Sequence, residues 1–222
     1  MRYLDLLTAL FATVLLVSNV ASTKLVVLGP FTFDGGTLLF PLAYIFGDVL
    51  TEVYGYRKSR RVIWIGFFAL LLATLTFQAV AHLPAPPDAE SQRFGEAFGL
   101  LLGLTPRIVL GSLLAYFLGE FANAYVLAKL KVRTEGRFFW LRALASTLVG
   151  QGLDTGVFLL VAFYGVFPKE VLLAVFLSNY AFKLGVKALM PPSTYAVVGF
   201  LKRAEGMDAY DRDTDFNPFR LT

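Results

Sequence analysis

Charged residues are scarce in this chain: Asp, Glu, Lys and Arg make up 16% of its 222 residues, whereas hydrophobic residues make up 57%. A soluble domain has about 25% charged residues, because its surface must face water. So few charges cannot cover a water-facing surface of ordinary composition, whereas a surface that faces lipid needs none. The composition therefore predicts an integral membrane protein.

Cysteine is absent, and histidine occurs once. The lack of cysteine excludes disulfides, thiolate metal sites and cysteine nucleophiles, and a single histidine argues against a zinc or haem site. The sequence also contains no Walker-type phosphate loop, no G-x-S-x-G and no H-E-x-x-H pattern. The chain therefore does not itself hydrolyse ATP, and we predict neither an enzyme nor a bound cofactor.

Six segments are apolar enough to cross the hydrocarbon core of roughly 30 Å, which takes about 20 helical residues. These segments are residues 6–23, 35–54, 62–81, 108–128, 143–167 and 171–201. Pro191 and Pro192 should kink or break the last segment. We therefore predict an all-α integral membrane fold, with a six-transmembrane-helix bundle over residues 1–204.

The remaining residues, 205–222, form a polar tail. We favour a solvated cytoplasmic tail, since terminal segments are commonly disordered. The alternative is that Phe216 and Phe219 fold the tail back onto the bundle.

Basic residues are concentrated in alternate loops. Residues 55–61 contain four basic residues and no acid, and residues 129–142 contain five basic residues against one acid. The intervening residues 82–107 form a proline-rich loop with an acidic excess. The positive-inside rule then places both basic loops and both termini in the cytoplasm, with the bundle in the inner membrane. The net charge of +4 is therefore a topology signal, and no nucleic-acid partner is expected.

Four ionisable side chains from four different segments fall near one depth. Ionisable groups inside a membrane are costly and are functional candidates for that reason. At about 1.5 Å per residue, each of these groups lies about 18–20 Å from one end of its helix. They are Asp48, Glu120, Asp154 and Lys183, and Asn19 falls at a similar level. Their varied, opposite charges suit a binding pocket better than a channel, which would have rings of like residues.

Structural roles compete with ligand binding at several of these positions. Asp154 and Lys183 lie on consecutive antiparallel helices, so a buried ion pair and ligand contact are equally open. Glu52 follows Asp48 by one turn, and we expect it to form a salt bridge to a basic residue of the 55–61 loop, either Arg60 or Arg61. Lys187, one turn beyond Lys183, is expected only to extend its amine toward the membrane surface.

Other candidates come from the same faces. Asn179 shares one helix face with the two lysines, and aromatic residues beside polar positions could stack on a flat ligand. Gly152 and Gly156 suggest a close helix contact around Asp154. Such small-residue faces also leave a homodimer open. The candidate substrate-binding residues are accordingly Asp154, Asp48, Glu120, Asn179, Lys183, Asn19, Gln151, Tyr44, Phe158, Tyr180 and Glu52.

Several motifs in this chain resemble those of the queuosine precursor transporter family, which is also described as a vitamin uptake family. They are S-N at residues 18–19, F-P-L-A-Y-I-F-G-D-V-L-T-E-V-Y-G at 40–55, A-S-T-L-V-G-Q-G-L-D-T-G-V-F at 145–158, N-Y-A-F-K at 179–183 and F-N-P-F at 216–219. The D-x-x-T-E-x-Y-G and L-D-T-x-x-F segments are specific in combination, whereas either alone is weak.

This resemblance implies a transporter that imports 7-deazaguanine bases, such as 7-cyano-7-deazaguanine, 7-aminomethyl-7-deazaguanine or queuine, for tRNA modification. A carboxylate could accept the adjacent N–H donors of such a base in a bidentate fashion. Asp154 or Asp48 is the favoured carboxylate, with Glu120 third. The keto oxygen of the base needs a donor, for which the candidates are Asn179, Asn19 and Lys183.

The family is also similar to the six-helix substrate-binding subunits of energy-coupling-factor transporters, which implies an all-helical fold. The expected partners are therefore a small nucleobase-like solute and the lipid bilayer. One alternative is a substrate-binding subunit that needs a separate ATPase. A less favoured alternative is a membrane enzyme.

Overall fold

The computed structural model describes residues 2–28, 31–103 and 106–220. Within these ranges the chain forms eight α-helices, one 3-10 helix (η1) and one two-stranded antiparallel hairpin. In chain order the elements are α1 (Leu4–Ala21), β1 (Leu25–Leu28), β2 (Phe31–Asp34), η1 (Gly35–Leu39), α2 (Phe40–Tyr54), α3 (Tyr56–Ala81), α4 (Ala89–Leu102), α5 (Pro106–Arg133), α6 (Phe139–Phe163), α7 (Lys169–Leu189) and α8 (Pro191–Glu205).

Five helices, α1, α3, α5, α6 and α7, are long and apolar enough to cross a membrane. The structure thus supports a multi-pass membrane protein, but a sixth continuous spanning helix is not among the described elements. The predicted span at residues 35–54 is instead η1 followed by α2. The 15 residues of α2 extend about 22 Å, less than the roughly 30 Å hydrocarbon core.

Three further elements differ from the prediction or refine it. The hairpin β1–β2 means that the fold is not purely helical, and it was not among the predicted elements. The expected loop at residues 82–107 contains α4, whose first turn is capped by the Asp88 carboxylate. The predicted break at the prolines is confirmed, because α7 ends at Leu189 and α8 begins at Pro191.

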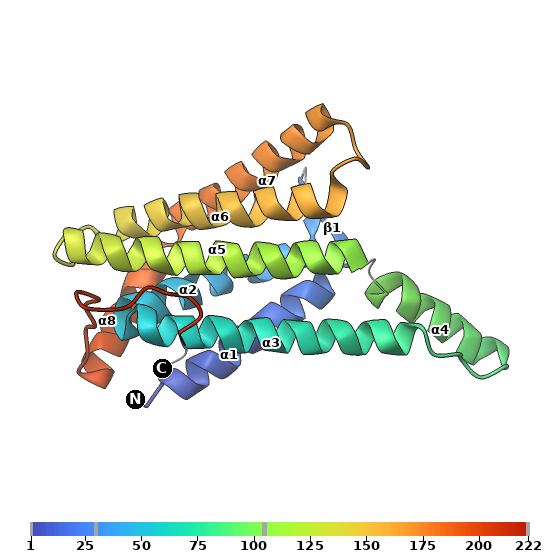
Figure 1. The fold of residues 1–222 in the computed structure, drawn as a ribbon, viewed down its shortest axis with the longest axis horizontal. Helices are drawn as coiled ribbons and strands as arrows, with labels where there is room; N and C mark the ends of the chain where they lie inside the picture. Colours follow the sequence, from blue (N-terminus) through green and yellow to red (C-terminus); the bar gives the residue numbers. More distant parts are fainter. Residues whose placement is uncertain (1, 29–30, 104–105, 221–222) are drawn as a thin grey trace.

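Helices α1, α3 and α6 run in one direction through the bundle, and α5 and α7 run in the opposite direction (Figure 1). Both termini lie at one end of the bundle, together with the α2–α3 junction, the α5–α6 loop and α8, while α4 and the α6–α7 loop lie toward the other end. At the α2–α3 junction Gly55 adopts φ 80°, a conformation that glycine takes without strain. The elements that carry the basic loops therefore share one end with the termini, as the charge pattern predicts.

Helices α5 and α6 pack unusually closely. A Cβ placed on Gly119 would lie 2.8 Å from the Asp154 Cβ, and one on Gly150 would lie 2.7 Å from the Asn123 Cβ. Only glycine permits such an approach of two helix backbones. The glycines singled out from the sequence have another role, since a Cβ on Gly152 or Gly156 would make ordinary 3.6 Å contacts with aromatic rings of α7.

The tail packs along α3, which is the alternative that the Phe216 and Phe219 rings suggested. Asp211 accepts a hydrogen bond from the Tyr56 backbone N–H (2.9 Å) at the start of α3, where unpaired N–H groups need an acceptor. The Trp64 indole N–H donates to the Pro218 carbonyl (2.8 Å). Arg60 donates to two further tail carbonyls. The tail is thus attached to the bundle rather than solvated.

Candidate functional site

Helix α2 carries two acidic side chains one turn apart, Asp48 and Glu52. They are 0% and 1% exposed, because α2 packs against α1, α3, α5 and α8. Bulk water cannot hydrate either carboxylate, and a buried charge requires a cation and hydrogen bonds in its place. The partners of these two acids therefore define the polar interior of the bundle.

Asp48 forms an ion pair with Lys187 of α7 through its Oδ2 atom. The Lys187 side chain is 5% exposed, so the expectation that it extends toward the membrane surface is wrong. The second carboxylate oxygen, Oδ1 of Asp48, is buried without a hydrogen-bond partner among the described residues. An unsatisfied buried acceptor costs about 1–3 kcal/mol, which makes this oxygen a natural attachment point for a donor group.

Asp154 and Lys183 form the second ion pair of the interior. The Lys183 Nζ lies 2.8 Å from Oδ2 of Asp154 and 3.2 Å from the Thr155 hydroxyl. Of the two alternatives left open by the sequence, the ion pair between these consecutive antiparallel helices is thus present. The pair is less buried than the first, with side chains 29% and 16% exposed.

A small polar cavity lies where α2, α5, α6 and α7 meet. Its volume is about 10 Å³, roughly the space that one water molecule occupies. It is lined by Ala43, Gly47, Asp48, Glu120, Asn123, Thr147, Gln151 and Lys187. Three of the sequence candidates, Asp48, Glu120 and Gln151, therefore come together at one site. The Oδ1 atom of Asn123 is also buried without a hydrogen-bond partner among the described residues.

Sequence reasoning missed Asn123 and Thr147. Both carry a detectable signal, because Asn123 lies three residues after Glu120 and Thr147 lies four residues before Gln151. Residues at these spacings share a helix face. A search for neutral polar side chains one turn from each candidate would have found them.

The Asp48–Lys187 pair also borders a second cavity of about 70 Å³. The other residues that line it are mostly apolar: Phe139, Trp140, Ala143, Leu144, Ala188, Pro191 and Thr194. They come from the first turns of α6 and α8 and from the end of α7, which is the end of the bundle near the termini (Figure 1). The ion pair thus stands between a polar space and an apolar one.

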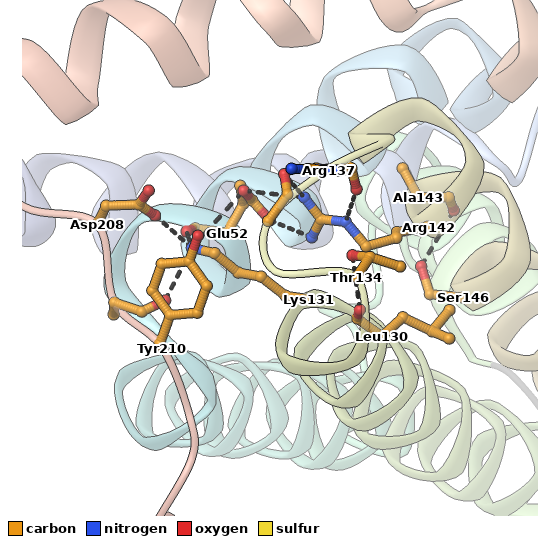
Figure 2. A network of polar contacts seen from close by, with 12 residues as sticks. Glu52, Leu130, Lys131, Thr134, Arg137, Arg142, Ala143, Ser146, Asp208 and Tyr210 are labelled. Atoms are coloured by element: carbon orange, nitrogen blue, oxygen red, sulfur yellow. Dashed lines mark hydrogen bonds and ion pairs between the residues drawn. The ribbon is translucent and has the colours of Figure 1, made fainter.

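Glu52 is the centre of a charge network, called here the Glu52 cluster, that comprises Glu52, Lys131, Arg142, Lys202 and Asp208. Figure 2 shows Glu52, Lys131, Arg142 and Asp208 of this cluster. Arg142 donates two hydrogen bonds to the Glu52 carboxylate, at 2.7 and 3.3 Å. Lys202 donates a third at 2.9 Å. These bonds join α2 to α6 and α8.

The tail completes the Glu52 cluster through Asp208, which accepts hydrogen bonds from Lys131 and Lys202. Burial raises the pKa of Asp208, but the hydrogen bonds from the two lysines outweigh it and hold the pKa below its usual range. The prediction that Glu52 forms a salt bridge to Arg60 or Arg61 is wrong. Arg60 lies on α3 and donates to tail carbonyls instead.

Four other candidates, Asn19, Asn179, Phe158 and Tyr180, do not line the polar cavity. Asn19 donates to the Leu15 carbonyl of its own helix (3.2 Å), and Asn179 is exposed. The Phe158 ring packs on Phe163. Tyr180 stacks on another ring of α7 and donates to the Leu148 carbonyl (2.7 Å). The side chain of Tyr44 lies outside the described residues.

Comparison with known proteins identifies similar sequences. The family model described as “Putative vitamin uptake transporter” matches residues 34–197. The chain is 36% identical over 188 residues to the “Probable queuosine precursor transporter” of Bacillus subtilis (strain 168), covering 84% of this chain and 80% of that protein. It is 27% identical over 168 residues to the “Queuosine precursor transporter” of Escherichia coli (strain K12), covering 73% and 71%. No solved structure matches significantly.

Proposed function

We propose that this chain, which belongs to the “Putative vitamin uptake transporter” family, imports a queuosine precursor across the inner membrane. The precursor is a 7-deazaguanine base that the cell uses for tRNA modification. The observation that carries this proposal is the polar cavity between α2, α5, α6 and α7. It holds paired charges and unpaired acceptors deep in a bundle that otherwise consists mainly of apolar side chains. Polar groups of this kind inside a membrane mark substrate or ion pathways.

The unpaired acceptors match the chemistry of the base. A 7-deazaguanine presents adjacent N–H donors along one edge, and the cavity offers Oδ1 of Asp48 from α2 and Oδ1 of Asn123 from α5. A hydrogen bond to a charged acceptor contributes more than one between neutral groups. Asp48 is therefore the proposed carboxylate, in preference to Asp154, which does not line the cavity. The Gln151 amide can donate to the keto oxygen.

The present conformation is closed around this site. The cavities of about 10 and 70 Å³ on the two sides of the Asp48–Lys187 pair are smaller than the few hundred Å³ of a typical ligand pocket. Movement of Lys187 away from Asp48 would join them. The polar space would then bind the edge of the base, and the apolar space with Phe139 and Trp140 would receive its flat face.

The Glu52 cluster closes the bundle at the end near the termini, because its ion pairs hold α2 against α5, α6 and α8. Alternating access requires that such a barrier opens on one side when the other side closes. We assign the Glu52 cluster to the cytoplasmic barrier, in agreement with the orientation predicted from the basic loops.

The test is uptake of radiolabelled 7-cyano-7-deazaguanine by cells that lack both their own synthesis of the base and their own importer. The wild-type chain should restore saturable uptake and queuosine in tRNA. Asp48→Asn should reduce uptake at least about tenfold, because it removes one charge-assisted hydrogen bond that contributes about 1.5–3 kcal/mol. Glu170→Gln, at the exposed start of α7, is the matched control and should transport normally.

Two outcomes would contradict the proposal. No uptake by the wild-type chain, at confirmed membrane expression, would exclude the base as substrate. Normal uptake by Asp48→Asn with loss in Asp154→Asn would reverse the assignment of the carboxylates. Uptake by the purified chain in liposomes without ATP would in addition exclude dependence on a separate ATPase.

A further inference from the structure

The charges around the polar cavity do not balance. Three carboxylates lie at this level, and two of them have a lysine: Asp48 pairs with Lys187, and Asp154 pairs with Lys183. The third carboxylate belongs to Glu120 of α5. Among residues 2–28, 31–103 and 106–220, no hydrogen bond or ion pair to this carboxylate is found. With all five groups ionised, this level of the bundle therefore carries one negative charge in excess.

Within the described part of the chain, the surroundings of Glu120 offer it no cation beyond Lys183 and Lys187. The charged groups that act on its carboxylate are Asp154 from α6, Asp48 from α2, and Lys187 and Lys183 from α7. On α5 itself the nearest titratable group is Tyr116, whose hydroxyl donates to the Ile63 carbonyl of α3 (3.0 Å). Both lysines are already engaged by aspartates, so an ionised Glu120 has to compete for them.

The two buried oxygen atoms without a hydrogen-bond partner among the described residues provide a second, independent observation. Among the described residues, no donor reaches the buried Oδ1 atoms of Asp48 and Asn123, and both residues line the cavity together with Glu120. Asp48 as a whole is 0% exposed. The groups at this level are thus short of one positive charge, and two acceptors that line the cavity have no donor among the described residues. A single proton on Glu120 would supply both, since a protonated carboxyl is neutral and carries one O–H donor.

We propose that Glu120 is the site at which this carrier binds a coupling proton, so that one proton enters the cell with each molecule of base. The inference rests on the proposed function, because it concerns the energy source of that transport. The proton comes from the external water, is held on a Glu120 carboxylate oxygen, and leaves to the cytoplasm. The base itself is not chemically changed.

Competition for Lys187 links this proton to the opening between the two cavities. When Glu120 is protonated, Lys187 remains on Asp48, and the pair separates the two cavities. When the proton leaves, two carboxylates of the same cavity compete for one ammonium group, and Lys187 is drawn toward Glu120. The polar and the apolar cavity are then joined. Once the Glu52 cluster also opens, the base leaves at the end that carries the termini, on the same side as the proton.

The test uses the full-length purified chain in liposomes, with radiolabelled 7-cyano-7-deazaguanine and the membrane potential clamped at zero. Two readouts are compared: exchange of the base at equal pH, and accumulation driven by an inward proton gradient. For the wild-type chain, a gradient of about one pH unit should drive accumulation toward roughly tenfold, the ratio of the proton concentrations. Glu120→Gln, which resembles the protonated state, should accumulate no base above equilibrium, and its exchange at equal pH is measured beside that of the wild-type chain.

Glu170→Gln is the control, with the same chemical change at the exposed start of α7, and it should accumulate the base like the wild-type chain. Gradient-driven accumulation by Glu120→Gln equal to that of the wild type would overturn the proposal. Wild-type exchange without any response to the gradient would also overturn it, while leaving the proposed function intact. Absence of wild-type exchange would instead refute the proposed function, and the proton site with it.

A second measurement applies if Glu120→Gln is not stably produced. Downhill influx of unlabelled base into wild-type liposomes at equal pH should make the external medium more alkaline, as protons follow the base inward. Influx that leaves the external pH unchanged would overturn the proton site. A rise in external pH that scales with the amount of base taken up would support it.

Discussion

Lys187 is the residue on which both proposals depend. It pairs with Asp48, it borders both cavities, and it is the only buried side chain among the described residues of α7. A buried lysine and aspartate together are not a strong source of stability, but removal of one partner leaves the other charge unpaired. The pair can therefore be tested separately from transport.

Lys187→Met should lower the free energy of unfolding by about 3–5 kcal/mol, because the Asp48 carboxylate stays buried without its cation. The double variant Asp48→Asn with Lys187→Met should recover much of this loss, since it buries no charge at this position. Thermal and denaturant unfolding of the detergent-solubilised protein measure both effects. A single variant as stable as the wild type would show that the pair is not formed as described.

At the scale of helices, the bundle combines a tight contact with a loose one. Glycines bring α5 and α6 into backbone contact, and these helices supply Glu120, Asn123, Thr147 and Gln151 to the cavity. Helix α7, which carries Lys183 and Lys187, is otherwise largely exposed within the chain. Relative movement is therefore expected between α7 and the α5–α6 pair rather than within that pair.

Gly119→Ala should destabilise the protein by about 1–3 kcal/mol, because the new methyl group would lie 2.8 Å from the Asp154 Cβ and force the helices apart. Gly156→Ala is the matched control on the other face of α6. Its methyl group would lie 3.6 Å from the Phe176 ring, an ordinary contact, and alanine favours a helix over glycine by up to about 1 kcal/mol. Equal melting temperatures of the two variants would contradict the tight α5–α6 contact.

At the scale of the whole molecule, the arrangement of the ends can be tested directly because the chain has no cysteine. Single cysteines at Arg137 and Arg203 should react with a membrane-impermeant maleimide only after the cells are permeabilised. Single cysteines at Glu96 and Lys169 should react in intact spheroplasts. All four positions are exposed in the structure, so the difference reports the side of the membrane. The reverse labelling pattern would contradict the predicted orientation and the cytoplasmic assignment of the Glu52 cluster.

The sequence predicted the depth of the ionisable side chains in the bundle, but it did not predict which residues they contact. Counting residues along each helix placed Asp48, Glu120, Asp154 and Lys183 at one level, because the helical rise converts sequence number into height. Height does not say which face of a helix meets which neighbour. For that reason the partners of Glu52 were predicted on the adjacent basic loop, whereas the structure supplies Arg142, 90 residues away, from α6.

Local breaks in helical geometry were equally hard to predict. The 3-10 turn η1 and the hairpin β1–β2 lie in stretches that are apolar enough to read as part of a span or its boundary. The homodimer stays a prediction. The argument from small residues is weaker than before, because Gly119, Gly150, Gly152 and Gly156 all face other helices of the same chain.

The docked tail also has a consequence for biosynthesis. Asp211 caps the start of α3 from a position 155 residues further along the chain. At about 5–20 residues per second, the ribosome needs about 8 to 30 s to synthesise that interval. During this time α3 is already made, while Arg60 and Trp64 have no tail carbonyls to bind and Lys131 has no Asp208. The bundle end that we assign to the cytoplasm is therefore completed late in synthesis, after the helices that line the cavity have been made.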